Sequence, residues 1–205
     1  MVQYKLSYFD ARGIGEPARL ILHYANVPFE DDRIKQEDWP SRKATFQYGV
    51  VPVLEVDGKT ISQSFAIYRY LARQFGLTGK DNFEAAQIDA VADFHKDVYS
   101  ELASYLYTKL GYRQGDPAPF KQAFLESADK LFPTYVKLLK ESGSGFFAKS
   151  GVSWADFLIA NYLLSIRNNE PEVLKKHQDL EEFVDRVHAL PQIKEYVEKR
   201  TQFVW

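Results

Sequence analysis

Residues 50–75 read VVPVLEVDGKTISQSFAIYRYLARQF, and the hydrophobic pattern changes halfway along this stretch. Residues 53–56 and 59–61 are short strand-like segments joined by Asp-Gly, a dipeptide typical of two-residue β-hairpin turns. From Ser64 to Phe75 the apolar residues recur three and four positions apart, as on the buried face of an amphipathic helix. The stretch therefore predicts a β-hairpin followed by a helix.

The residues before this stretch predict a further strand–helix–strand unit. Residues 2–8 alternate apolar and polar side chains with the period of a strand, which two glycines and Pro17 then end. A helix is predicted over residues 18–24, with the proline in its first turn, and a strand over residues 29–34. Residues 35–49 are interpreted as a long polar connection. The order βαβ-ββα thus fills the first part of the chain.

After residue 76 the strand patterns give way to helical ones. The segment GLTGKDN at residues 76–82 has the composition of a linker. Beyond it, one apolar stripe with helical spacing is formed by Ile88, Val91, Ala92, His95, Val98, Leu102, Tyr105 and Leu106. We therefore predict an α/β domain over residues 1–76 and an all-helical domain, a helical bundle, over residues 83–205.

Capping residues mark the starts of further helices in the second domain. Asp116-Pro117 has the form of an N-cap followed by proline at the first helical position. Ser153 and Asp156 have the spacing of a capping box, with Asp in place of the usual Glu. Shorter helices are predicted after Asp179 and Pro191.

The composition excludes several classes of function. Lys and Arg number 26 and Asp and Glu 28, so the net charge of −2 creates no field that would draw nucleic acid or anionic lipid. The sequence contains no cysteine, which excludes disulfides, thiolate metal sites and a cysteine nucleophile. Neither a signal peptide nor an apolar run of about 18 residues is present. We therefore expect a cytoplasmic protein that binds neither nucleic acid nor membrane.

The residues that could carry chemistry gather in the first domain. No P-loop, GxGxxG, HExxH or GxSxG motif is present, and the four histidines lack the spacing of metal ligands. His95, on the apolar stripe, is interpreted as a helix residue with a satisfied partner. The remaining candidates are Tyr8 at a strand end, Trp39 with Lys43, Val51-Pro52, and Gln63-Ser64 at the start of a helix.

Each of these candidates has a structural interpretation as packing or capping, beside a functional one. A helix N-terminus behind Ser64 would bind a carboxylate. Val51 would offer backbone hydrogen bonds to a peptide, because Pro52 cannot continue the strand ladder. Such a site suits a small peptide that carries its own thiol.

In their order and spacing these residues resemble the glutathione S-transferases, most closely the sigma-like class, which includes nematode enzymes and prostaglandin D synthases. The matching segments are YKLSYFDARG, DWP, VVPVLEVDG, SQSFAIYRYLAR and VSWADF. The resemblance covers essentially the whole chain. It implies a thioredoxin-like first domain and the conjugation of reduced glutathione to apolar electrophiles in detoxification. Glutathione is then a co-substrate, and no metal or other cofactor is expected.

The resemblance also implies the residues of a glutathione site. Tyr8 is expected to be catalytic, donating a hydrogen bond to the glutathione sulfur. The glutathione-binding residues implied with it are Trp39, Lys43, Gly49, Val50, Val51, Pro52, Gln63, Ser64 and Asp97. Trp39 and Lys43 are expected to bind the glycine carboxylate of glutathione. Val51, which precedes the expected cis-proline Pro52, is expected to pair with the cysteinyl backbone. Gln63 and Ser64 are expected to bind the γ-glutamyl carboxylate.

The resemblance further implies a homodimer. Asp97 is expected to reach the γ-glutamyl amine across the dimer interface. Tyr48 occupies the place of an aromatic side chain that several classes insert into the partner subunit. Ser153 and Asp156 match a folding cap of the family, which is structural.

The electrophile pocket is the second site that the resemblance implies. Its expected lining is Phe9, Gly13, Ile14, Leu102, Tyr105 and Leu106, with the tail at residues 203–205 as a cover. Two residues depart from the sigma-class prostaglandin synthases. Ile14 stands where those enzymes tend to carry arginine, and Lys96 stands where they carry an acid associated with metal activation. Both departures favour uncharged apolar electrophiles over prostaglandin endoperoxides.

Alternative functions remain open at this stage. A glutathione-dependent prostaglandin isomerase or peroxidase would use the same Tyr8 thiolate chemistry. A non-catalytic protein that binds haem or other apolar ligands, or a crystallin-like protein, would use only the scaffold. The presence of Tyr8 with a full binding set argues against a loss of catalysis.

Overall fold

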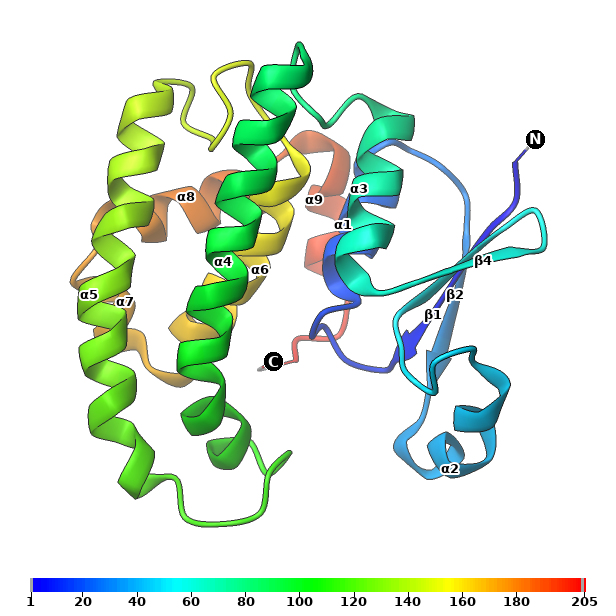
Figure 1. Cartoon of the computed structure of the whole chain (residues 1–205), viewed down its shortest axis with the longest axis horizontal. Helices are drawn as coiled ribbons and strands as arrows, with labels where there is room; N and C mark the ends of the chain where they lie inside the picture. Colours follow the sequence, from blue (N-terminus) through cyan, green and yellow to red (C-terminus); the bar gives the residue numbers. More distant parts are fainter. Residues whose placement is uncertain (1, 204) are drawn as a thin grey trace.

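The computed structural model describes residues 2–203 and 205, and the strands within them form one mixed sheet (Figure 1). In spatial order these are β2 (Glu30–Ile34), β1 (Tyr4–Phe9), β3 (Val53–Val56) and β4 (Lys59–Ser62). β2 runs parallel to β1, whereas β3 pairs antiparallel with β1 and β4. Helix α1 (Glu16–Tyr24) makes the crossover that a parallel pair requires. The predicted βαβ-ββα order and thioredoxin-like fold are confirmed.

The rest of the chain is helical, as predicted. After α3 (Ser64–Phe75) come α4 (Asn82–Lys109), α5 (Ala118–Ser142), α6 (Trp154–Asn169), α7 (Pro171–Lys175), α8 (Gln178–His188) and α9 (Pro191–Lys199). Figure 1 shows α4, α5 and α6 side by side in a bundle, with α1 and α3 between this bundle and the sheet. Most side chains of α6 are buried, because α6 packs against helices of both halves of the molecule.

Three local features differ from the sequence prediction. Residues 35–49 hold short helical turns, at η1 (Gln36–Asp38), α2 (Trp39–Arg42) and η2 (Lys43–Thr45), rather than a plain connection. These turns, like the five-residue α7, are too short for a periodic hydrophobic pattern to reveal them. Helix α5 begins at Ala118, with Pro117 as its N-cap, and the carboxylate of Asp116 accepts from the Ala118 N–H at 2.9 Å.

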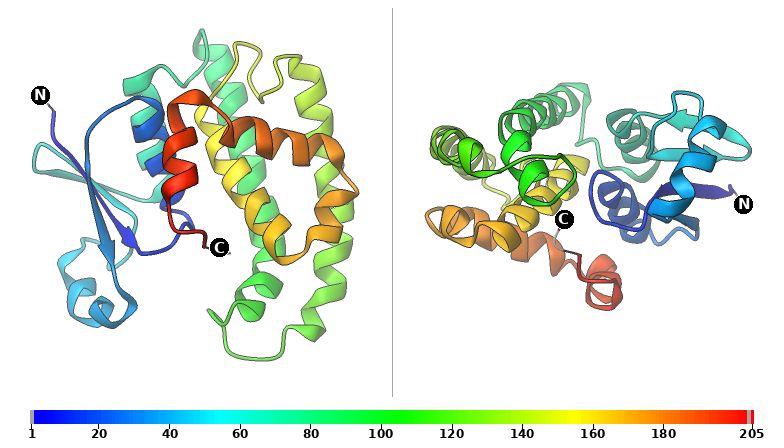
Figure 2. Two further views of the ribbon diagram at one scale, coloured as in Figure 1. Left: turned by 180° about the vertical axis from the view of Figure 1, so that it is seen from behind. Right: turned by 90° about the horizontal axis from the view of Figure 1, so that it is seen from below.

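The C-terminal tail returns to the loop that follows β1 (Figure 2). The backbone N–H of Arg12 donates to the carbonyl of Trp205 at 3.3 Å, and Arg12 Nε donates to the carbonyl of Phe203 at 3.1 Å. The strand that bears Tyr8 is therefore followed by a loop in contact with the far end of the chain. In the part of the chain that the structure describes, no helix has the length and apolar character needed to cross a membrane.

Candidate active site

Tyr8, near the end of β1, is the residue around which the site is built. Its ring is buried, and its oxygen accepts a hydrogen bond from the backbone N–H of Ile14 at 3.2 Å. Burial raises the pKa of Tyr8 to about 12, although the Ile14 bond and the positive charge of Arg19 act in the opposite direction. The hydroxyl therefore keeps its hydrogen at neutral pH and can act as a donor.

The loop at residues 10–15 lies directly against the Tyr8 ring. The carbonyl of Ile14 accepts a hydrogen bond from Tyr68 on α3, and the carbonyl of Gly13 accepts one from Asn161 on α6 at 2.9 Å. The loop is thus held from three sides, by the sheet residue Tyr8 and by two helices. Its backbone conformation is fixed by contacts with both halves of the molecule.

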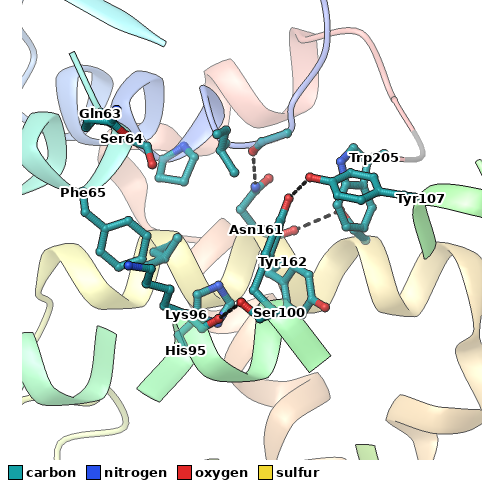
Figure 3. Close-up of a pocket in the computed structure, with 16 residues that line it drawn as sticks. Gln63, Ser64, Phe65, His95, Lys96, Ser100, Tyr107, Asn161, Tyr162 and Trp205 are labelled. Atoms are coloured by element: carbon teal, nitrogen blue, oxygen red, sulfur yellow. Dashed lines mark hydrogen bonds between the residues drawn. The ribbon is translucent and has the colours of Figure 1, made fainter. Parts of the chain in front are cut away.

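A cavity of about 490 Å³ opens beside this loop (Figure 3). Gly13, Ile14 and Pro17 line it from the first half of the chain, together with Gln63, Ser64 and Phe65 at the start of α3. The helical half contributes His95, Lys96, Tyr99, Ser100, Tyr107, Leu158, Asn161, Tyr162, Ser165 and Trp205. The lining combines aromatic and aliphatic side chains with several polar ones, which suits small organic ligands.

The N-terminus of α3 supplies an anion-binding feature at this cavity. Gln63 is the N-cap residue, with φ +74°, and its side chain makes no capping hydrogen bond. The first N–H groups of α3 and the positive end of its dipole are therefore available to a carboxylate. Gln63 and Ser64 thus lie at the start of this helix, as predicted.

The other candidate glutathione-binding residues do not line this cavity. The ring of Phe9 packs edge to face against Tyr8, with the ring centroids 5.6 Å apart. Phe9 also packs edge to face against Trp39, with the centroids 5.1 Å apart. Lys43 extends past Gly49, where a Cβ would lie 3.5 Å from Lys43 Cε. The Val51–Pro52 peptide bond is cis. Val50 and Asp97 are exposed, the first before β3 and the second on α4.

The structure separates the expected lining of the electrophile pocket into two groups. Gly13 and Ile14 line the cavity, whereas Phe9 does not line it and packs against the Tyr8 ring. Leu102, Tyr105 and Leu106 instead lie in the helical core, where the Tyr105 hydroxyl donates to Glu170. They do not line this cavity, because the apolar stripe of α4 faces the neighbouring helices.

Another face of α4 lines the cavity in place of that stripe. Tyr99, Ser100 and Tyr107 follow Lys96 by three, four and eleven residues, so one side of the helix presents all four. The hydroxyls of Tyr99 and Tyr107 are hydrogen-bonded to each other. Sequence reasoning singled out Lys96 but missed Tyr99, Ser100 and Tyr107, because periodicity does not show which neighbouring face of a helix borders a cavity.

The tail and His95 also take part in the cavity. Trp205 lines it and contacts the rings of Tyr99, Tyr107 and Tyr162, whereas Val204 lies outside the described residues. His95 is hydrogen-bonded through Nδ1 to the Tyr135 hydroxyl at 2.8 Å, which confirms that it has a satisfied partner. It nevertheless also borders the cavity, which the sequence analysis did not anticipate.

Each half of the chain is similar to a known protein family. A family model described as the N-terminal domain of glutathione S-transferases matches residues 4–73. A second model, described as the C-terminal domain of glutathione S-transferases, matches residues 96–200. Between them the two models account for most of the chain.

Individual relatives match over nearly their full length. Glutathione S-transferase 1 of Ascaris suum is 44% identical over 201 residues, which are 98% of each chain. A solved structure described as a Nu-class glutathione S-transferase from Haemonchus contortus is 36% identical, with a TM-score of 0.90 and full coverage of both chains. A structure described as a monomeric glutathione S-transferase from the hookworm Necator americanus is 34% identical, with a TM-score of 0.92, covering 99% of this chain and all of that one.

Proposed function

Because this chain belongs to the glutathione S-transferase family and is such an enzyme, we propose that Tyr8 stabilises the glutathione thiolate for attack on apolar electrophiles. The observation that carries the proposal is the hydrogen bond from the Ile14 N–H to the Tyr8 oxygen at 3.2 Å. Since this bond occupies a lone pair of the phenol oxygen, the phenol hydrogen is left to donate to a bound ligand.

These contacts supply enough free energy to lower the thiol pKa of glutathione as the mechanism requires. A thiol with a pKa of about 8.5 needs roughly 2.7 kcal/mol of preferential thiolate stabilisation to reach a pKa of about 6.5. A charge-assisted hydrogen bond supplies about 1.5–3 kcal/mol. The N-terminus of α3 adds roughly 0.3–1 kcal/mol. No metal, further cofactor or general base is needed in this mechanism.

The residues around Tyr8 suit the two ends of glutathione. We assign the γ-glutamyl carboxylate to Gln63 and Ser64, because the uncapped N-terminus of α3 attracts an anion there. We assign the glycine carboxylate to Trp39, whose ring packs against Phe9 next to Tyr8, and to Lys43 on the following helical turn. Val51, before the cis-proline, offers its backbone to the cysteinyl residue between them.

The cavity beside the loop is our candidate for the electrophile site. Its aromatic rings offer apolar surface to a flat or conjugated substrate, and the uncharged Ile14 stands beside Tyr8. We therefore expect neutral apolar electrophiles as substrates, and a rate insensitive to Mg²⁺ because Lys96 lines the site in place of an acid. The sigma-like class assignment stays a prediction, since the relatives include one described as Nu-class.

The variant Tyr8→Phe tests the mechanism. It removes only the hydroxyl, so we expect glutathione binding within a few-fold of wild type and turnover lower on the order of 10²-fold. Tyr4→Phe, in the same strand, is the matched control and should keep full turnover. An ultraviolet thiolate band of bound glutathione that is equally strong in wild type and in Tyr8→Phe at neutral pH would refute the assignment.

A substrate panel separates this function from its alternatives. Aromatic halides, lipid peroxides and reactive aldehydes report transferase and peroxidase activity. Prostaglandin H2, with and without Mg²⁺, reports isomerase activity, which would turn over without consuming glutathione. A chain that binds haem or other apolar ligands but shows no turnover with any of these substrates would point to a carrier.

We also propose that two copies of this chain form a homodimer, with Tyr48 as an anchor. Tyr48 is 60% exposed, so its ring is available to a partner subunit. A groove of about 700 Å³ between α4 and α5 is lined by Val91, Phe94 and Leu138 and suits an aromatic ring. In a twofold dimer each Tyr48 would enter the groove of the other copy. Asp97 would then reach the partner's glutathione.

Two further assignments are part of the proposal. We assign glutathione binding to a domain over residues 1–76 and most of the electrophile site to a domain over residues 83–205. We place the enzyme in the cytoplasm, where glutathione is available in reduced form.

A further inference from the structure

One peptide group connects the helical half of the molecule with the Tyr8 hydroxyl. The N–H of Ile14 donates to the Tyr8 oxygen at 3.2 Å, and the carbonyl of Gly13 belongs to the same peptide group. That carbonyl accepts a hydrogen bond from Nδ2 of Asn161 at 2.9 Å (Figure 3). Asn161 lies on α6 and is 5% exposed. A residue of the bundle is therefore hydrogen-bonded to the peptide group that contacts the Tyr8 oxygen.

The orientation of the Asn161 amide is fixed by a buried cation. Nη1 of Arg12 donates to Oδ1 of Asn161 at 2.8 Å. A guanidinium can only donate, so the amide oxygen must face Arg12 and the amide nitrogen must face Gly13. Arg12 is 2% exposed, and burial lowers its pKa to about 10, which leaves it charged at neutral pH. Its remaining hydrogen bonds go to neutral oxygens of Ser165, Phe203 and the Asn161 backbone.

These contacts form a chain in which every donor points in the same direction. The guanidinium draws electron density from the Asn161 amide, which makes the amide N–H a stronger donor to Gly13. The carbonyl of Gly13 is polarised in turn, and the Ile14 N–H becomes a stronger donor to the Tyr8 oxygen. Successive hydrogen bonds polarise one another in this way, most strongly in a buried site.

We propose that Asn161 is a positioning residue, which polarises the Gly13–Ile14 peptide group so that the Tyr8 hydroxyl donates more strongly to the glutathione sulfur. The inference rests on the role proposed for Tyr8. It assigns to α6 a part in activating the thiol, in addition to its place in the core. The contact between Asn161 and Gly13 is the step that a variant can remove selectively.

The variant Asn161→Asp isolates that step because it is almost isosteric. A carboxylate still accepts from Arg12, so the buried cation keeps its partner, but it cannot donate to the carbonyl of Gly13. We expect the pKa of bound glutathione to rise by roughly 0.5 to 1, and kcat/KM at pH 6.5 to fall about two- to sixfold. The KM for glutathione should change less than kcat. Asn161→Leu, which introduces no charge, should shift the pKa in the same direction.

A double-mutant cycle with Tyr8→Phe gives the decisive test. The thiol pKa is read from the ultraviolet thiolate band of bound glutathione as a function of pH. If Asn161 acts through the Tyr8 hydroxyl, neither Asn161 variant will shift the pKa further when Tyr8 is already phenylalanine. Asn169→Ala, two turns further along α6 and outside the cavity lining, is the matched control and should keep the wild-type pKa.

Two outcomes would overturn the inference. One is a folded Asn161→Asp enzyme with the wild-type thiol pKa. The other is an equal shift in the presence and absence of the Tyr8 hydroxyl, since this would reveal a through-space effect of charge or packing. A Tyr8→Phe single variant with an unchanged thiol pKa would refute the proposed function itself, so the two failures are distinguishable.

Discussion

The loop after β1 approaches the Tyr8 ring so closely that two of its positions accept only glycine. A Cβ at Gly13 would lie 2.5 Å from the Tyr8 oxygen, and a Cβ at Gly15 would lie 2.3 Å from Cδ1 of the same ring. Gly13 also has φ +40°, a conformation that side chains with a Cβ adopt at a cost. These glycines allow the Ile14 N–H to reach the phenol oxygen.

Replacement of Gly13 by alanine should therefore damage catalysis more than stability. We expect Gly13→Ala to displace the Tyr8 hydroxyl and to lower kcat/KM on the order of 10²-fold, as loss of a positioned catalytic donor does. Gly111→Ala is the control, because Gly111 has φ +78° but open space around its Cα. Gly111→Ala therefore introduces a similar backbone strain of about 1–2 kcal/mol from the positive φ, but its new Cβ collides with no other atom. Equal losses of activity in steady-state assays of both variants would contradict this account.

His95 makes the stability of the protein depend on pH. Desolvation lowers the pKa of this buried imidazole from 6.5 to about 3, so the folded protein leaves it neutral where the unfolded chain would protonate it. The unfolded state therefore binds more protons between these pKa values, and stability falls as the pH is lowered through 6.5. Protonation of His95 in the unfolded chain should therefore lower the unfolding free energy by about 2 kcal/mol as the pH falls from 7.5 to 5.

Urea denaturation of wild type and His95→Gln over this pH range provides the measurement. The variant will be less stable at pH 7.5, since it loses the bond to Tyr135, but its unfolding free energy will depend less on pH. Burial also lowers the pKa of His188 to about 4, so His188 makes a further contribution to the pH dependence of the unfolding free energy, and the His95→Gln variant retains that contribution. Parallel pH curves for the two proteins would show that His95 is not responsible.

At the scale of secondary structure, the start of α6 is fixed by the predicted capping box. The carboxylate of Asp156 accepts from the Ser153 N–H and the Ser153 hydroxyl, each at 2.8 Å, and from the N–H of Phe147 at 2.8 Å. Both reciprocal bonds of the box are present. Because both side chains are completely buried, water cannot replace these bonds if one is lost.

We therefore expect Ser153→Ala to cost about 1–2 kcal/mol of unfolding free energy, toward the upper end for an N-cap residue. The measurement is equilibrium denaturation, with Ser41→Ala as the control. Ser41 is exposed on α2, where its hydroxyl donates to the carbonyl of Asp38, and its loss should cost less than about 0.5 kcal/mol. Similar destabilisation by the two substitutions would contradict the assigned role of the box.

At the scale of the whole molecule, the proposed dimer makes a direct prediction about Tyr48. An aromatic side chain that fills a partner's groove is typical of a binding hot spot, whose truncation costs about 2–4 kcal/mol. Tyr48→Ala should therefore weaken dimerisation by roughly 30- to 1,000-fold in sedimentation experiments. Tyr112→Ala removes another exposed aromatic ring and should leave the dimer constant unchanged. A wild-type chain that is fully active as a monomer would refute the proposal; the hookworm relative is described as monomeric.

A buried ionic cluster shows how the two halves of the chain depend on each other. Glu16 on α1 pairs with Arg19 one turn later and with Arg200 after α9, and its carboxylate accepts from the Tyr196 hydroxyl. These charges are far from water, so each requires its partners to remain buried. The end of the chain is thereby tied to the helix that follows the Tyr8 loop.

The sequence by itself determined the features that depend on near neighbours in the chain. The hairpin around Asp57-Gly58, the helix from Ser64 to Phe75 and the capping box at Ser153 are all confirmed, because each rests on residues within a few positions of one another. The fold class followed from the order of these elements. Tyr8 and Gln63-Ser64 were found as candidates from the sequence as well, through the motifs around them.

Only the tertiary structure decided which side chains surround Tyr8. Periodicity identified one apolar face of α4 but could not tell that a neighbouring face, with Tyr99 and Tyr107, would line the cavity. Nor does any local pattern link Asn161 to Gly13, which are 148 residues apart. Such contacts arise when separate elements pack together, so their partners are set by the geometry of the whole fold and not by spacing along the chain.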